Sequence, residues 1–158
     1  MKIPWQKPFV SEKERNHLIN AFDSTWLSDG EYVERFESNL AKSLNCAKEH
    51  IISVSNGTVS LHLCFILANI QPGDEVILPG FSFSAAMNIC IITGAKPILV
   101  DVCPDSWCMN PEDIESAITS KTKAIVPIHN FGTCSNMDKI VELAKKHNLL
   151  IIEDAAES

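Results

Sequence analysis

Apolar residues in this chain follow two alternating rhythms, one typical of helices and one typical of buried strands. Steps of three and four residues indicate amphipathic helices, as at Val33, Phe36, Leu40 and Leu44. Short aliphatic runs indicate strands that are buried on both faces. Strands are predicted at 51–54, 75–78, 97–102, 124–128 and 149–152. Helices are predicted from a cap at residue 11 to about 23, at 33–44, 59–68 and 83–93, from 111 onward, and from 137 to 147.

Several helix starts carry their own local signals. Ser11 and Glu14 form a capping-box pattern, in which each side chain bonds to the backbone of the other residue. Asn110 stands before Pro111, a residue suited to the first position of a helix, and Asn136 can cap the last helix. These signals fix three helix starts more firmly than the apolar rhythm alone.

Strands that alternate with helices predict parallel pairing, because each crossover returns the chain to the same end of the sheet. The expected fold class is α/β, a mostly parallel sheet with flanking helices. Ligands bind where parallel strands end, so the segments to examine are 55–58, 79–84, 129–133 and 153–158. The predicted core consists of Ile51, Ile52, Val54, Leu61, Leu63, Val76, Ile77, Leu78, Ile98, Val100, Ile125, Val126, Leu150, Ile151 and Ile152.

Composition narrows the class of protein. A chain of 158 residues with 46% hydrophobic and 21% charged residues is a globular protein with room for one domain. A net charge of −7 without Lys/Arg clusters excludes nucleic acid as an expected partner. Without a signal peptide or membrane span, the six scattered cysteines indicate free thiols in the cytoplasm, with metal ligation as the alternative.

Four groups of residues at the strand ends can carry chemistry. Ser55 to Thr58 can form either a phosphate cradle at a helix start or an ordinary cap and turn. Phe81 and Phe83 can form a platform for a ring or pack into the core. Glu153 and Asp154 can hold a protonated ring nitrogen or form a solvated acidic loop. His129 can be a base, a stacking group or a hydrogen-bonded loop histidine.

Taken in order, the motifs resemble those of a known family. They stand at 26–30, 55–58, 73–77, 79–83, 94–97, 100–102, 122–129, 137–138 and 152–157, with Ile3-Pro4 at the start. The chain resembles the DegT/DnrJ/EryC1/StrS family of pyridoxal-phosphate-dependent nucleotide-sugar aminotransferases. The resemblance implies the large domain of a fold-type I aminotransferase. It divides the chain into an N-terminal segment, 1–30, and a partial cofactor-binding domain, 31–158.

The resemblance also assigns roles to individual residues. Gly57 and Thr58 match the residues that hold the cofactor phosphate, and Phe83 matches the aromatic residue that stacks on the pyridine ring. Asp154 matches the catalytic acid that pairs with the pyridine nitrogen and keeps it protonated. Glu157 stands where many members have Gln, near the phenolic oxygen of the ring. Glu at this position, as in perosamine synthases, favours a 4-amino-6-deoxysugar pathway.

The implied activity is transfer of an amino group, with glutamate as the expected donor, to a keto-sugar on a nucleotide carrier. Such enzymes make amino-deoxysugars for surface polysaccharides, and their active sites form between two subunits, which implies a homodimer. The family's Schiff-base lysine lies beyond the matched aspartate, whereas no lysine follows Asp154 here. We therefore expect an N-terminal fragment that is inactive and poorly soluble by itself.

Two other functions stay open at this point. One is a truncated remnant without catalytic activity that at most binds phosphate weakly or dimerises. The other is an unrelated doubly wound nucleotide-binding module, which the missing dinucleotide fingerprint disfavours.

Overall fold

The computed structural model describes residue 2 and residues 7–158, which fall into two compact units divided after Ser53. The smaller unit contains α1 (Glu12–Asp23), α2 (Glu31–Ser43) and the short 3-10 helix η1 (Lys48–His50). The Ile3-Pro4 pair of the resemblance lies outside the described residues. The predicted division after residue 30 stays a prediction.

Helix α1 begins as its sequence predicts. The Ser11 side chain accepts from the Lys13 N–H, and Glu14 Oε2 accepts from the Ser11 N–H at 2.8 Å. Hydrogen bonds from Ser11 hold the pKa of the Glu14 carboxyl below its ordinary value. The predicted capping box is therefore confirmed.

The larger unit is built on a sheet of four parallel strands in the order β2-β1-β3-β4. Its strands are β1 (Glu75–Pro79), β2 (Lys96–Val100), β3 (Thr122–Ile125) and β4 (Leu150–Ile151). Its helices are α3 (Gly57–Leu67), α4 (Ala85–Ile92), α5 (Pro111–Ala117), α6 (Met137–His147) and the 3-10 helix η2 (Asn130–Gly132). The predicted α/β class with a parallel sheet and flanking helices is confirmed.

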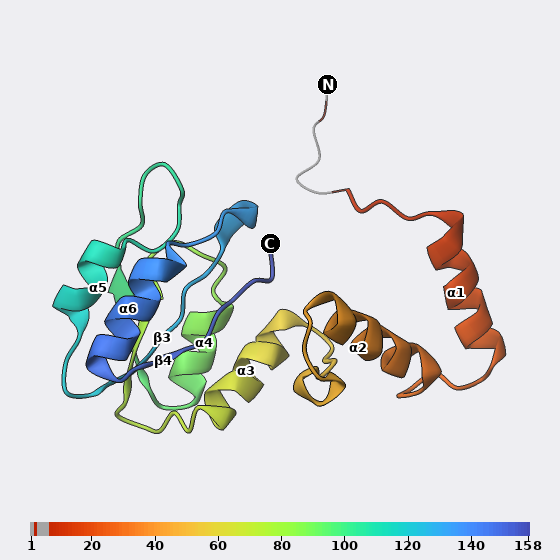
Figure 1. Cartoon of the computed structure of the whole chain (residues 1–158), viewed down its shortest axis with the longest axis horizontal. Coiled ribbons are helices and arrows are strands. Elements are labelled where there is room, and N and C mark those ends of the chain that lie inside the picture. The colour runs from red at the N-terminus through yellow and green to blue at the C-terminus, as the bar shows by residue number, and fades with distance from the viewer. Residues whose placement is uncertain (1, 3–6) are drawn as a thin grey trace. The chain divides into compact units, whose positions relative to one another are not determined.

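Helices cover both faces of this sheet, with α3 and α4 on one side and α5 and α6 on the other (Figure 1). Alternation along β1 divides the core between the two faces. Val76 and Leu78 pack with the α3/α4 cluster, whereas Ile77 packs with the α5/α6 cluster. All three side chains are buried, as predicted for a strand covered on both sides.

The predicted strand at 51–54 is wrong. Its backbone is extended at Ile51 (φ −112°, ψ 127°), but the segment pairs with none of the described strands. Ile52 is 68% exposed. Branched side chains favour an extended backbone, yet a strand also needs a neighbour with which to exchange hydrogen bonds.

The predicted core is correct where the sheet has neighbours on both faces. Eight of the predicted core residues are buried: Leu61, Val76, Ile77, Leu78, Val100, Ile125, Val126 and Ile152. The remaining seven are partly or largely exposed, and all lie in unpaired or edge segments or on the outer side of α3: Ile51, Ile52, Val54, Leu63, Ile98, Leu150 and Ile151.

Two helices differ from their predicted extents. The helix expected at 59–68 begins at Gly57, because Asn56 caps it, and only Leu61 and Phe65 in it are buried. The helix expected at 83–93 begins at Ala85, which leaves Phe83 in the preceding loop. Among the described residues, no helix has the length and apolar character needed to cross a membrane.

Candidate functional site

The start of α3 offers unpaired donors at the carboxyl edge of the sheet. Asn56 Oδ1 accepts from the Val59 N–H at 3.0 Å, which caps the helix. The N–H groups of Gly57 and Thr58 in the exposed first turn have no hydrogen-bond partner among the described residues. A Cβ built on Gly57 would lie 3.7 Å from the Ala156 Cβ. The predicted phosphate cradle therefore adjoins the segment that follows β4.

Asp154 continues β4 beside the end of β3. Its N–H donates to the Pro127 carbonyl at 2.9 Å, and its carbonyl accepts from the His129 N–H at 3.0 Å. Its Oδ1 accepts from the Ala156 N–H at 3.1 Å. These bonds fix both the backbone and the half-buried carboxylate, and leave Oδ2 available to a ligand.

His129 is buried, with one ring nitrogen hydrogen-bonded and the other beside a carboxylate. Its Nδ1 accepts from the Ser135 N–H at 3.2 Å, so the ring proton resides on Nε2. Nε2 lies 3.1 Å from Glu153 Oε1. The ring is only 4% exposed. Of the three roles left open by the sequence, the structure favours the hydrogen-bonded loop histidine.

Phe81 and Phe83 both stay out of the core. The ring of Phe83 is 75% exposed. The Phe81 ring instead lies in a small aromatic group, with its centroid 5.2 Å from that of Trp107 and 6.1 Å from that of Phe131. The interpretation that both pack into the core is wrong, and Phe83 is free to stack on a ligand ring.

Glu157 is held by the backbone of the loop after β3. Its Oε2 accepts from the Phe131 N–H at 2.7 Å. Phe131 adopts the left-handed conformation (φ 55°, ψ 27°), which is rare for a residue other than glycine. This bond joins the last segment of the chain to η2.

Asn130 is a residue that the sequence analysis did not single out. Its side-chain Nδ2 donates to the Phe81 carbonyl at 3.0 Å and to the Trp107 carbonyl at 2.7 Å. The residue is only 3% exposed. No sequence signal marks it, because its two acceptors are backbone groups in distant segments.

The predicted site residues thus lie close together in the fold although they are far apart in the sequence. Gly57 adjoins the 153–158 segment, Asp154 pairs beside His129, and Glu157 bonds to Phe131. Phe83 joins them through its loop, which Asn130 bonds at Phe81. All of these connections lie where the strands end, the usual place for a ligand in a parallel sheet.

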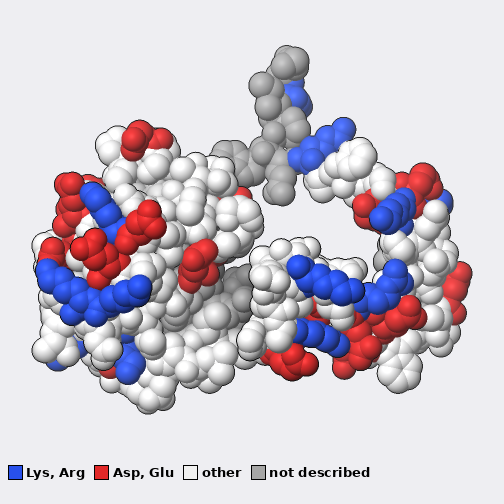
Figure 2. All heavy atoms as spheres, viewed as in Figure 1, with Lys and Arg blue, Asp and Glu red and all other residues white. Residues whose placement is uncertain are grey.

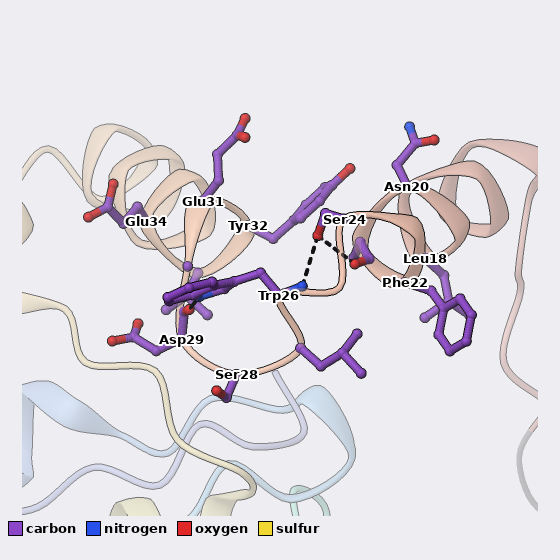
Figure 3. Close-up of a pocket in the computed structure, with 14 residues that line it drawn as sticks. Leu18, Asn20, Phe22, Ser24, Trp26, Ser28, Asp29, Glu31, Tyr32 and Glu34 are labelled. Atoms are coloured by element: carbon purple, nitrogen blue, oxygen red, sulfur yellow. Dashed lines mark hydrogen bonds between the residues drawn. The ribbon is translucent and has the colours of Figure 1, made fainter.

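A cavity of about 890 Å³ lies within the smaller unit, between α1 and α2. Figure 3 shows Trp26 from the connecting loop and Tyr32 from α2 at this cavity, with Asp29, Glu31 and Glu34 around it. The Trp26 indole N–H donates to the Asp29 carbonyl. A Cβ on Gly30 would lie 2.6 Å from Trp26 Cδ1, so a larger residue there would require the exposed Trp26 side chain to shift. None of the predicted site residues lines this cavity.

The part of the chain that the structure describes contains no candidate metal-binding cluster. There, no three His, Cys, Asp or Glu residues are grouped so that they could hold a metal ion. All six cysteines are free. Burial raises the pKa of the Cys90 thiol to about 11, which makes that thiol a poor nucleophile.

Residues 8–158 match the sequence profile of the DegT/DnrJ/EryC1/StrS aminotransferase family, nearly the whole chain. The chain belongs to this family. Among curated relatives, the GDP-perosamine synthase of Escherichia coli O157:H7 is 43% identical over 157 residues. That match covers 99% of this chain and 43% of the relative. A second GDP-perosamine synthase, from Caulobacter vibrioides, is 41% identical and is covered over 42% of its length.

Solved structures of the family agree with the fold. The aminotransferase TlmJ from Streptoalloteichus hindustanus has a TM-score of 0.94 at 32% identity, over 99% of this chain and 43% of TlmJ. NtdA from Bacillus subtilis, solved with its cofactor PMP bound, has a TM-score of 0.84 at 34% identity. That match covers 98% of this chain and 37% of NtdA. The chain therefore spans less than half the length of these family members.

Proposed function

We propose that this chain supplies the cofactor-binding edge of a pyridoxal-phosphate-dependent aminotransferase that acts on a nucleotide-linked keto-sugar. The close approach of Gly57 to Ala156 carries the proposal, because the unpaired N–H groups at the start of α3 then lie near the segment that contains Asp154. An anion site and a carboxylate for a cationic ring nitrogen are two of the polar contacts that this cofactor needs. The names of the relatives support the sugar class.

The residues present fit the cofactor in three respects. The first turn of α3 has two donors free for a phosphate, at Gly57 and Thr58. Asp154 Oδ2 is free for the ring nitrogen, and the exposed Phe83 ring can cover one face of the pyridine. When bound, pyridoxal phosphate supplies an electron sink for the carbanion formed on the amino acid.

Asp154 holds the proton at the ring nitrogen in this proposal. The Ala156 N–H keeps its carboxylate oriented, and the backbone bonds to Pro127 and His129 keep it at the strand end. Glu157 would contact the phenolic oxygen of the cofactor, and its Oε1 is the oxygen that the Phe131 N–H does not bind. The Phe131 N–H holds the Glu157 carboxyl in place through Oε2.

The remaining parts of the proposal concern the whole protein. The donor is an amino acid, with glutamate expected, and the product is an amino-deoxysugar nucleotide for surface polysaccharide. Six free cysteines suit the cytoplasm, and a homodimer completes the site.

A chimera tests the proposal directly. Residues 1–158 replace the matching segment of the E. coli O157:H7 GDP-perosamine synthase, and GDP-perosamine formation from glutamate is measured. We expect product, and we expect Asp154→Asn to lower kcat by about 10- to 100-fold, the equivalent of one charge-assisted hydrogen bond. The control, Glu142→Gln, changes an exposed acid on α6 outside the family motifs and should keep full activity.

Two outcomes would contradict the proposal. One is a chimera that has the circular dichroism and elution volume of the parent enzyme but makes no product. The other is full turnover by the Asp154→Asn chimera. If the chimera does not fold, titration of the chain itself with pyridoxamine 5′-phosphate replaces it, and absence of binding then refutes the cofactor site.

A further inference from the structure

Asn130 connects three segments of the site edge through a single buried amide. Its two amide hydrogens go to two carbonyl groups, one at Phe81 after β1 and one at Trp107 in the 102–109 hairpin. Carbonyl oxygens only accept, so the amide nitrogen must face them and the side-chain orientation is fixed. The side chain belongs to neither the phosphate cradle nor the pair of acids.

The loop that carries Phe83 is held by hydrogen bonds to its backbone and by the Phe81 ring, which packs near Trp107 and Phe131. At one end, the Gly80 N–H donates to the Val100 carbonyl at 2.7 Å. At the other end, Ser84 leads into α4. Between them, the bond from Asn130 to the Phe81 carbonyl joins the loop to the strand that ends beside Asp154. Because the Phe83 ring is 75% exposed, core packing does not set its place.

We propose that Asn130 is a positioning residue that sets the place of the Phe83 ring relative to Asp154. The inference rests on the proposed function, since Phe83 is the proposed stacking group there. Asn130 follows His129, whose N–H bonds to the Asp154 carbonyl, so one short segment ties the acid to the loop of the aromatic ring. A stack requires the ring and the acid to keep a fixed spacing.

Asn130→Asp is the sharpest substitution, because it keeps the shape and removes both donors. In this variant a carboxylate oxygen replaces the amide nitrogen and repels the Phe81 and Trp107 carbonyls. The loop that contains Phe81 and the 102–109 hairpin should therefore both detach from residue 130. Asn130→Leu removes the donors without adding charge. Asn39→Asp makes the same charge change at an exposed position on α2 and is the matched control.

The first measurement needs no ligand and reports whether the hairpin that contains Trp107 stays attached to residue 130. Trp5→Phe and Trp26→Phe leave Trp107 as the sole tryptophan, because the chain has three. Trp107 is 49% exposed, so detachment should raise its acrylamide quenching constant by up to about twofold. We expect this rise in Asn130→Asp and Asn130→Leu but not in Asn39→Asp, with unchanged far-ultraviolet circular dichroism. Unchanged quenching in both Asn130 variants would overturn the proposal.

The second measurement asks whether Asn130 acts through Phe83. The probe is pyridoxamine 5′-phosphate, whose amine cannot condense with lysines, titrated into the chain by calorimetry. Asn130→Asp should raise its Kd by about tenfold when Phe83 is present and by less than about twofold in a Phe83→Ala background. This coupling is a readout that general destabilisation would not produce, because destabilisation acts equally in both backgrounds.

The outcomes separate the two proposals. If the intact chain binds the probe and Asn130→Asp weakens binding equally with and without Phe83, the positioning role is refuted and the cofactor site stands. If the intact chain does not bind the probe at all, the cofactor site is refuted and the positioning role falls with it.

Discussion

The two faces of the sheet bury similar cores but present opposite outer surfaces. Under the helices, Phe65 on α3 and Ile140 on α6 are both fully buried. On the outside, α5 and α6 carry eight charged residues, whereas α3 and α4 carry no Asp, Glu, Lys or Arg. In Figure 2, charged side chains gather on the part of the larger unit where Figure 1 draws α5 and α6.

This difference in surface charge indicates the environment to which each face of the sheet is suited. A helix between core and water has one apolar side, which describes α6 well. A helix that is apolar all round meets protein on both sides, and α3 and α4 have that character. Their outer residues Ile66, Leu67, Ile91 and Ile92 are 56–79% exposed. The α5/α6 face is thus suited to solvent, whereas the α3/α4 face exposes apolar surface to it.

The largest expected effect comes from breaking the cores beneath the two faces. Phe65→Ala should lower the free energy of unfolding by about 3–5 kcal/mol, and Ile140→Ala by about 2–5 kcal/mol. Urea titration followed by circular dichroism measures both. Leu67→Ala, on the outer side of α3, should change stability by about 0.5 kcal/mol or less. A loss below about 1 kcal/mol for Phe65→Ala would show that α3 is not packed as described.

A smaller effect should follow from changing the outer surfaces. Leu67→Glu with Ile92→Lys keeps the net charge and should raise the concentration at which the chain self-associates by at least about tenfold, because two exposed apolar side chains are removed. Sedimentation velocity measures this. The converse pair, Glu142→Leu with Lys145→Leu, makes α6 resemble α3 and should promote association. If both pairs of substitutions changed self-association equally, the proposed difference between the two faces would be wrong.

The smallest effect concerns charge on the α5/α6 face. A hydrogen bond from Lys146 holds the pKa of Glu115 below its ordinary value, and the same bond raises the pKa of Lys146. Glu115 therefore contributes stability above its unfolded pKa that is lost as the pH falls through its folded pKa. Lys146 contributes stability below its unfolded pKa that is lost as the pH rises through its folded pKa.

Lys146→Met should thus destabilise the chain slightly near neutral pH and make almost no difference in acid. Both partners are more than half exposed, so salt should screen the effect further. Thermal unfolding of both proteins at pH 3 and pH 7, with and without 1 M salt, checks this. A difference that persists unchanged at pH 3 would exclude the ion pair as its cause.

Local signals predicted much of the fold. The capping box at Ser11 and the caps at Asn110 and Asn136 each appear where the sequence put them, because a cap involves residues only two or three apart. The strand expected at 51–54 failed because pairing depends on a distant partner. Ile98 and Ile151 are partly buried against the α5/α6 cluster, so the core prediction holds in part for them. The other five residues are less buried than predicted for a related reason, since sequence shows that a residue is apolar but not what covers it.

The candidate site shows the same limit. Gly57, Thr58, Phe83, Asp154 and Glu157 came from motifs, and the structure supplies contacts for several of them, although their roles stay predictions. The bonds of Asn130 to Phe81 and Trp107 span 49 and 23 residues and leave no local pattern. The pairing of His129 with Glu153 likewise appears only after the strands are laid side by side.

Those long spans bear on the order in which the chain folds. The amide of Asn130 reaches Phe81 only after β3 has paired with β1 across the intervening α4, β2 and α5, so we expect its bonds to form late. A bond absent from the folding transition state leaves the folding rate nearly unchanged when it is removed and speeds unfolding instead. The edge of the sheet where the ligand is proposed to bind would then be the last part of this unit to assemble, and the first to open.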